Sequence, residues 1–179
     1  MFFLSLSFSA IEAETNARHP MKALWPSPDP PPKALHHLPD ETGKEDYILR
    51  SGGVDLAVDY FLPRISEKED PASPVAFFRG RILSVSFFPD KHYDIAIDSE
   101  SRPKDNILSL IGHIEGQELA GFTMTITDES YLLRLRDFDA SIIYRVVGDT
   151  RTGAGRVSEI DLRKMPPVEY QPPLVPEKH

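Results

Sequence analysis

Short alternating runs of apolar and polar residues, separated by turns, are the feature that most restricts the fold of this chain. Between residues 108 and 135 the runs are LSLIGHI, FTMTIT and YLLRL, and the turns EGQELAG and TDES lie between them. A period of two places successive side chains on opposite faces of a β-strand, so each run predicts a strand with one buried face. In the middle run we assign Phe122, Met124 and Ile126 to the core and Thr123 and Thr125 to the outer face.

The same pattern extends on both sides of this stretch. YILRSGGVDLAVDYFL contains two runs around a Gly-Gly pair, which predicts a turn between two strands, with Val54, Leu56 and Val58 on one face. Further strands are predicted in RILSVSFF, HYDIAIDSE, ASIIYRVVGD and RVSEIDL, and no window has a sustained helical period. Strands of this length with turns every ~8–12 residues predict an all-β fold, either an antiparallel β-sandwich or a meander-type barrel.

Seventeen prolines, gathered toward the two ends, separate the predicted domain from its flanking segments. We divide the chain into a truncated signal peptide (1–13), a proline-rich linker (14–45), a β-rich domain (46–167) and a proline-rich tail (168–179). Proline fixes φ and lacks an amide donor, so the linker and the tail are expected to be extended. The run MFFLSLSF followed by small residues is typical of a secretory signal without its basic start, and a buried strand is the other interpretation. We therefore expect a secreted, periplasmic or cell-surface protein.

Charge and composition exclude several classes of function. The net charge is −8, whereas nucleic acids and anionic membranes bind clustered Lys and Arg, so neither partner is expected. The chain has no cysteine, which excludes disulfides, a cysteine nucleophile and thiolate metal sites. The apolar run at the N-terminus is shorter than the roughly 20 residues of a membrane-spanning helix, so no membrane span is predicted.

No catalytic motif occurs in the sequence. HExxH, GxSxG and Walker sequences are absent, and GDTRTGAG leads into a strand pattern instead of the helix that a phosphate-binding loop needs. Asp90, His92 and Asp94 alternate, so in one strand they would share a face, and they are the candidates for a metal-dependent enzyme site. We favour a solvated outer face for these three residues and for His113. The prediction is therefore a non-enzyme without catalytic residues, cofactor or metal.

The order of segments from Val54 to Pro167 resembles a known family. SFFPDKHYDIAIDS is followed by a strand, the turn and strand EGQELAGFTMTI, two more strands, and EIDLRKMPP, a strand closed by a proline pair. This order is similar to the N-terminal propeptide of secreted reprolysin-like (adamalysin-type) zinc metallopeptidases, especially the bacterial members. The resemblance covers about two-thirds of the chain, and EGQELAGFTMTI and EIDLRKMPP carry most of it.

The resemblance implies a propeptide-like module that shields the catalytic cleft of the peptidase, assists its folding, or does both. Its partner would be the catalytic domain, in cis within a longer chain or in trans. Two family features are missing, because no zinc-binding helix motif follows Pro167 and no cysteine can reach the zinc. In the tail, Glu177 and His179 are the candidates to contact the cleft, since carboxylate and imidazole are ordinary zinc ligands.

A second hypothesis comes from a different class of protein. A secreted or cell-surface β-sandwich can bind glycan or protein through aromatic side chains that face solvent. Tyr93, Tyr131 and Tyr144 are the candidates for such a surface, and each of them equally fits a core or a cross-strand pair.

Overall fold

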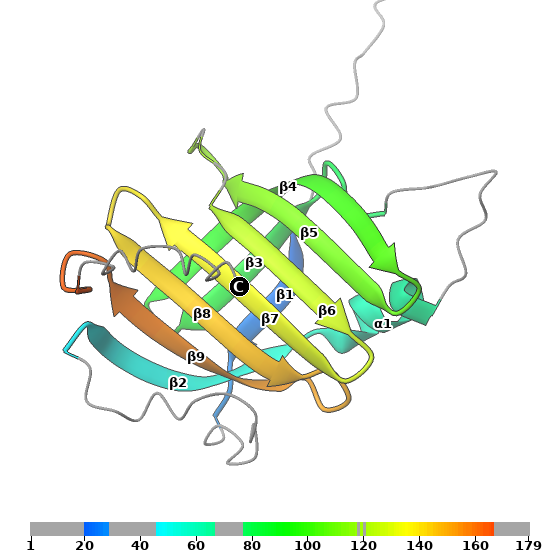
Figure 1. Cartoon of the computed structure of the whole chain (residues 1–179), viewed down its shortest axis with the longest axis horizontal. Coiled ribbons are helices and arrows are strands. Elements are labelled where there is room, and N and C mark those ends of the chain that lie inside the picture. Colours follow the sequence, from blue (N-terminus) through cyan, green and yellow to red (C-terminus); the bar gives the residue numbers. More distant parts are fainter. Residues whose placement is uncertain (1–19, 29–45, 67–76, 118, 120, 167–179) are drawn as a thin grey trace, which may run out of the picture.

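The computed structural model describes residues 20–28, 46–66, 77–117, 119 and 121–166. Within this part of the chain, nine strands form a closed barrel, and one helix lies beside it (Figure 1). The prediction of an all-β fold of the barrel type is therefore confirmed. The elements are β1 (Met21–Pro26), β2 (Ile48–Leu56), α1 (Val58–Ser66), β3 (Ile82–Phe88), β4 (Lys91–Lys104), β5 (Ile107–Ile114), β6 (Phe122–Thr127), β7 (Ser130–Asp137), β8 (Ile142–Asp149) and β9 (Ala154–Asp161).

The barrel is an antiparallel meander closed by its first two strands. From β3 to β9 each strand pairs with the next one in the chain, and β2 pairs antiparallel with β9. The short strand β1 then lies between β2 and β3, antiparallel to β2 and parallel to β3. Because β1 closes the circle, the barrel depends on a segment that precedes the predicted domain.

The predicted linker is wrong at this point. Residues 21–26 were assigned to the proline-rich segment 14–45, yet they form β1, and Ala23 and Leu24 are buried in the core. MKALWP is too short to show a period, and prolines surround it, so no local signal marks it as a strand. It is ordered by its two neighbours in the barrel, which supply backbone partners on both sides.

Two further expectations are corrected around β2. Gly52 and Gly53 do not form a turn but continue β2, where they pair with Val157 and Arg156 of β9. A Cβ at Gly52 would lie 3.1 Å from the ring of Phe88, so a small residue suits the close approach of that ring. The strand ends at Leu56, and the predicted run beyond it is the helix α1.

Helix α1 covers one end of the barrel (Figure 1). Phe61 and Ile65 stand one helical turn apart and are both buried, and the ring of Phe61 stacks on that of Phe78 with centroids 5.1 Å apart. In the part of the chain that the structure describes, no helix has the length and apolar character needed to cross a membrane.

The core follows the register predicted for the hairpins. Phe122, Met124 and Ile126 are at most 1% exposed, whereas Thr123 and Thr125 face solvent. The neighbouring strands pair Met124 with Leu110 on one side and Leu133 on the other, and these side chains also point inward. The barrel interior is therefore packed with side chains over this region.

Tyr131 is the largest of these interior side chains and lies against two glycines. A Cβ would lie 2.2 Å from its ring at Gly148 and 2.3 Å from its hydroxyl oxygen at Gly155, so both positions require glycine. Its hydroxyl donates a hydrogen bond of 2.9 Å to the carbonyl of Gly153. The glycines in VVGDTRTGAG thus make room for a buried ring, which is a packing role.

Candidate functional site

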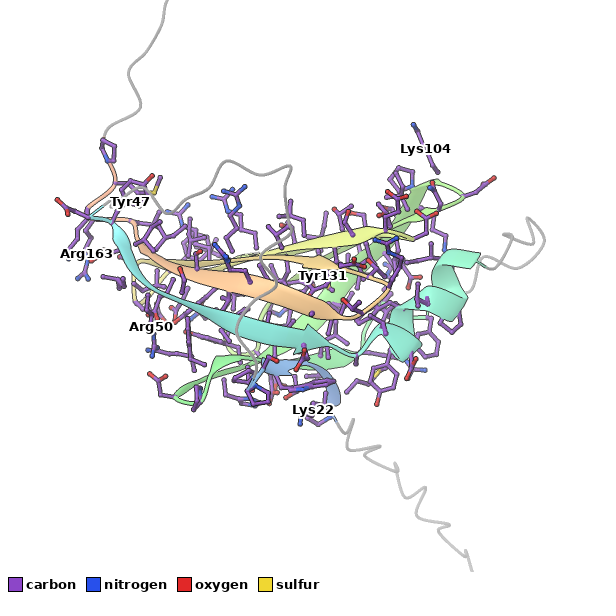
Figure 2. All side chains as sticks on the ribbon, turned by 90° about the horizontal axis from the view of Figure 1, so that it is seen from below. Lys22, Tyr47, Arg50, Lys104, Tyr131 and Arg163 are labelled. Atoms are coloured by element: carbon purple, nitrogen blue, oxygen red, sulfur yellow. The ribbon has the colours of Figure 1, made fainter. Side chains whose placement is uncertain are left out.

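The end of the barrel opposite α1 is polar. Figure 2 shows Tyr47, Arg50 and Arg163 at this end, and Lys104 at the other end beside the helix. Three carboxylates at inward-facing strand positions are buried here, Asp137, Glu159 and Asp161. We call Arg50, Asp90, Tyr93, Asp137, Tyr144 and Glu159 the polar network.

Arg50 of β2 binds two carboxylates of the polar network, Asp90 and Glu159. Its Nη1 and Nη2 donate hydrogen bonds of 2.8 and 2.9 Å to the two carboxylate oxygens of Asp90, which lies in the turn between β3 and β4. Its Nε donates to Glu159 on β9, and the guanidinium lies 4.0 Å from the ring centroid of Phe88. Hydrogen bonds from Arg50 hold the pKa of the Asp90 carboxyl below its usual range.

Arg50 lies in the part of β2 that the short strand β1 does not reach. That strand ends at Pro26, which pairs with Val54, and the amide of Ser27 still donates to the carbonyl of Gly53. Nearer its start, β2 has β9 on one side and no β1 residue on the other. Side chains join the barrel across this seam, because Arg50 contacts both β9 and the β3–β4 turn.

Two tyrosines carry the network across the interior. The hydroxyl of Tyr93 lies 3.1 Å from Asp137 Oδ2 and 3.1 Å from the hydroxyl of Tyr144, which in turn lies 3.4 Å from Glu159 Oε1. The ring of Tyr144 stacks on Phe87, with centroids 4.4 Å apart and planes inclined by 7°. The two phenol groups have one proton each, whereas the chain from Asp137 through Tyr93 and Tyr144 to Glu159 contains three oxygen–oxygen contacts. All three contacts are hydrogen bonds only when one of the two carboxyl groups carries a proton.

Burial determines the protonation of these phenols. It raises the pKa of Tyr93 to about 12, and it also raises the pKa of Tyr144, because a phenolate is poorly solvated inside the barrel. Both hydroxyls are therefore protonated at neutral pH and act as hydrogen-bond donors. The network joins β2, β4, β7, β8 and β9, which suits it to holding the barrel end together.

The three residues proposed for a metal-dependent site are not brought together. Asp90 lies in the turn before β4 and is bound by Arg50, whereas His92 and Asp94 lie on the outer face of β4. His92 Nδ1 is 2.8 Å from Ser86 Oγ, and its Nε2 is 3.5 Å from Asp94 Oδ1. Among the described residues, no group of three or more His, Asp or Glu side chains is arranged to hold a metal ion. Asp90 precedes β4, which begins at Lys91, so the expectation that all three residues share one face of a strand is wrong.

The other candidates divide between buried and undescribed positions. Tyr131 and Tyr144 are at most 1% exposed, and Tyr93 is half-buried, so these rings do not form an aromatic surface. His113 is partly exposed on β5, with its Nδ1 2.9 Å from Asp98 Oδ2. The signal segment 1–13 and the tail residues Glu177 and His179 lie outside the described residues.

A second surface was not anticipated from the sequence. Outward-facing residues of β7, β8 and β9 form what we call the arginine face: Arg134, Arg136, Ile143, Arg145, Arg156 and Ile160. The alternation in LRLRD carried part of the signal, because arginines two apart in a strand share a face. The net charge of −8 gave no indication of this surface, because a net charge does not describe where the charges lie.

Comparison with known proteins gives no family assignment: no family model, no curated protein and no solved structure matches this chain. What the fold and the site define is a class, a closed mixed β-barrel covered by a helix at one end and held by a charged network at the other.

Proposed function

We propose that this chain is a non-catalytic, propeptide-like module of a secreted zinc metallopeptidase. It would shield the catalytic cleft, assist the folding of the catalytic domain, or do both, within one longer chain or as a separate protein. The support is that the two segments most similar to the family belong to one barrel. EGQELAGFTMTI leads from β5 into β6, and EIDLRKMPP ends β9 and leaves the barrel.

The chemistry of the polar network agrees with a binding role. Asp90 and Glu159 are engaged by Arg50, and Asp137 accepts hydrogen bonds from Tyr93 and from the amide of Ala140. These groups hold one strand to another, which rigidifies the barrel. A rigid body that binds its partner stoichiometrically loses little conformational entropy on association.

Closure of the barrel restricts how a peptidase would be engaged. Peptidase clefts bind extended chains by adding a strand, and the edge of an open sheet would offer such a strand. In the described barrel, β1 joins β2 to β3, so the circle has no terminal strand, and the first half of β2, which β1 does not reach, is spanned by the side chain of Arg50. We therefore propose that the cleft is occupied by the tail 168–179 and that the barrel contributes its wall and loops.

Inhibition of a peptidase tests this proposal. Increasing amounts of the full chain should slow peptide hydrolysis by a reprolysin-like catalytic domain from the same source, with an end point at equal molar amounts. Deletion of 168–179 should weaken inhibition and leave the thermal unfolding of the barrel unchanged. Glu177→Ala and His179→Ala, separately and together, test whether either side chain contacts the zinc.

Two results would contradict the proposal. One is the absence of both inhibition and co-purification with such catalytic domains. The other is inhibition that the tail deletion leaves intact, which would move the contact to the barrel. Specific binding to a glycan or a surface protein, without any effect on peptidases, would favour the alternative of a cell-surface binding module.

A further inference from the structure

The outward side chains of the described strands β5 and β6 include no Asp, Glu, Lys or Arg, although 27% of the residues in the chain are of these types. The two strands lie side by side on one wall of the barrel (Figure 1). Four of these outward residues form what we call the neutral wall: Ser109, Ile111, Thr123 and Thr125. Such a surface leaves water at a lower cost than a charged one, because no charge has to be desolvated.

The neutral wall is open and carries exposed apolar side chains. In the described strands, three large apolar side chains are exposed, and two of them lie here. Ile111 is 43% exposed at the centre of the wall, and Leu132 is 46% exposed on β7, directly opposite Thr125. Thr123 and Thr125 are exposed as well. A second surface that covered these side chains would therefore bury apolar area.

Opposite charges flank the neutral wall in one row of the sheet. Along this row, Ile111 pairs with Ser99 of β4 on one side and with Thr123 of β6 on the other. Thr123 pairs in turn with Arg134 of β7. Asp98 lies beside Ser99, at the point where the register between β4 and β5 shifts. The row thus begins with a carboxylate and ends with a guanidinium.

Both flanking charges are accessible from outside the barrel. The Asp98 side chain is 46% exposed, and its Oδ2 lies 2.9 Å from Nδ1 of His113, an outward residue of β5. A carboxylate has acceptor sites for more than one donor, so the contact with His113 leaves room for a guanidinium. Arg134, at the other end of the row, is exposed.

A two-fold axis parallel to the strands makes this row complementary to itself. If the axis runs between β5 and β6, a second copy that packs face to face has its strands in reverse order and its rows at the same height. β4 of one copy then faces β7 of the other, so Asp98 meets Arg134 at both flanks, and Ile111 meets Thr123 in the centre. An axis running across the strands along this row would instead bring Asp98 against Asp98, and like charges repel.

We propose that the neutral wall and its charged flanks join two copies of this chain in a symmetric dimer. Each copy contributes the same residues, and both flanks carry the same pair of opposite charges, as a two-fold contact requires. The next row is compatible with this arrangement, because Ser109 then faces Thr125 and Leu132 faces Ser101 of β4. The dimer involves only copies of this chain and does not depend on a peptidase being the partner.

Sedimentation of the full chain from micromolar to millimolar concentration tests the dimer, and two charge variants test its geometry. Asp98→Arg places an arginine against Arg134 of the second copy, and Arg134→Asp places an aspartate against Asp98. Each variant alone should associate more weakly than the wild type, on the order of tenfold or more. An equimolar mixture should associate again, because each flank of the mixed dimer joins an arginine to an aspartate. Both variants keep a negative net charge, so a general attraction does not bring them together.

Lys22→Asp is the matched control for Arg134→Asp, because it changes the net charge equally on β1, outside the neutral wall (Figure 2). This control should leave association unchanged. The core cluster lies within one copy, so all variants should keep the thermal unfolding of the wild-type monomer. Asp98→Asn and Arg134→Gln cover the case in which a charge reversal disturbs folding, and each should weaken association to a smaller extent.

Three results would overturn the dimer. The first is a monomer at every concentration. The second is a dimer that neither charge variant weakens, or that Lys22→Asp weakens equally, because the contact would then lie elsewhere or reflect net charge alone. The third is a loss of association in both single variants that mixing does not restore, since the two-fold axis requires Asp98 of one copy to face Arg134 of the other.

Discussion

Arg50 and Asp90 form a two-pronged ion pair, with nitrogen–oxygen distances of 2.8 and 2.9 Å, across the one seam of the barrel that β1 does not cover. The same guanidinium donates through its Nε to Glu159, so a single side chain joins β2, β9 and the β3–β4 turn. The fork of donors suits this position, because lysine presents a point charge and cannot hold two carboxylates in the same plane.

Removal of Arg50 should destabilise the barrel through Glu159. The Glu159 side chain is 7% exposed, and among the described residues Arg50→Ala leaves it the hydroxyl of Tyr144, at 3.4 Å. We expect the free energy of unfolding to fall by about 2–3 kcal/mol, the cost of a buried charge that loses its partner. Urea unfolding measures this loss. Asp90→Asn removes only the exposed ion pair with Arg50 and should lower the free energy of unfolding clearly less. Equal losses in the two variants would contradict the conclusion that the buried Glu159 dominates the effect.

The barrel should become less stable at alkaline pH. Burial raises the pKa of Tyr93 to about 12 and also raises the pKa values of Tyr131 and Tyr144, whereas unfolded tyrosine titrates near 10. Above pH ~10 the unfolded chain loses protons that the native chain keeps, so the unfolding free energy decreases as pH rises. For each retained proton the slope is about 1.4 kcal/mol per pH unit, and the stabilisation from Tyr93 is lost as pH passes its native pKa.

Urea unfolding across the alkaline range checks this slope, with Tyr144→Phe as the informative variant. It removes one titrating hydroxyl and keeps the ring that stacks on Phe87, so the slope should become shallower by one proton. At neutral pH it should cost about 1 kcal/mol for the lost hydrogen bond. Phe122→Leu removes no phenol. It should therefore lower the free energy of unfolding by the same amount at every pH and leave its slope against pH unchanged. A slope that Tyr144→Phe does not alter would mean that another group titrates.

Gly148→Ala should disturb the packing of Tyr131. The added Cβ would lie 2.2 Å from the ring, so the ring or the backbone must move, and overpacking of this kind costs about 1–3 kcal/mol. Gly116→Ala is the matched control, because Gly116 has φ +87° and no atom within 4 Å of the added Cβ. It should cost only backbone strain, about 1 kcal/mol. Thermal unfolding compares the two, and an equal loss would argue against the contact with Tyr131.

Truncation of Phe122 should be the most damaging of the hairpin substitutions. The side chain is 1% exposed and belongs to the core cluster, so Phe122→Ala should cost about 3–5 kcal/mol. Thr123→Lys, on the outward side of the same strand, should change stability by less than about 0.5 kcal/mol. Chemical denaturation distinguishes the two. Comparable losses would mean that the outer face of β6 is also packed against another element.

The all-β class and the inward register of β5, β6 and β7 were predictable because both depend on local alternation. The pattern FTMTIT assigns Phe122 inward and Thr123 outward whatever the partner strands are. The sequence also shows directly that the chain has no cysteine and no common catalytic motif. Such properties depend on residues close together in the chain, so a window of about ten residues contains them.

The tertiary structure decided the rest, because the decisive contacts join distant residues. β1 is a strand only between β2 and β3, and the run after Leu56 becomes a helix with Phe61 against Phe78. Arg50 meets Asp90 and Glu159, which are 40 and 109 positions away, and nothing near Arg50 in the sequence indicates either partner. Alternation describes which face of a strand is buried, but it contains no information about which strands are neighbours. Closure of the barrel, the polar network and the gathering of arginines on one wall therefore came from the pairing of strands.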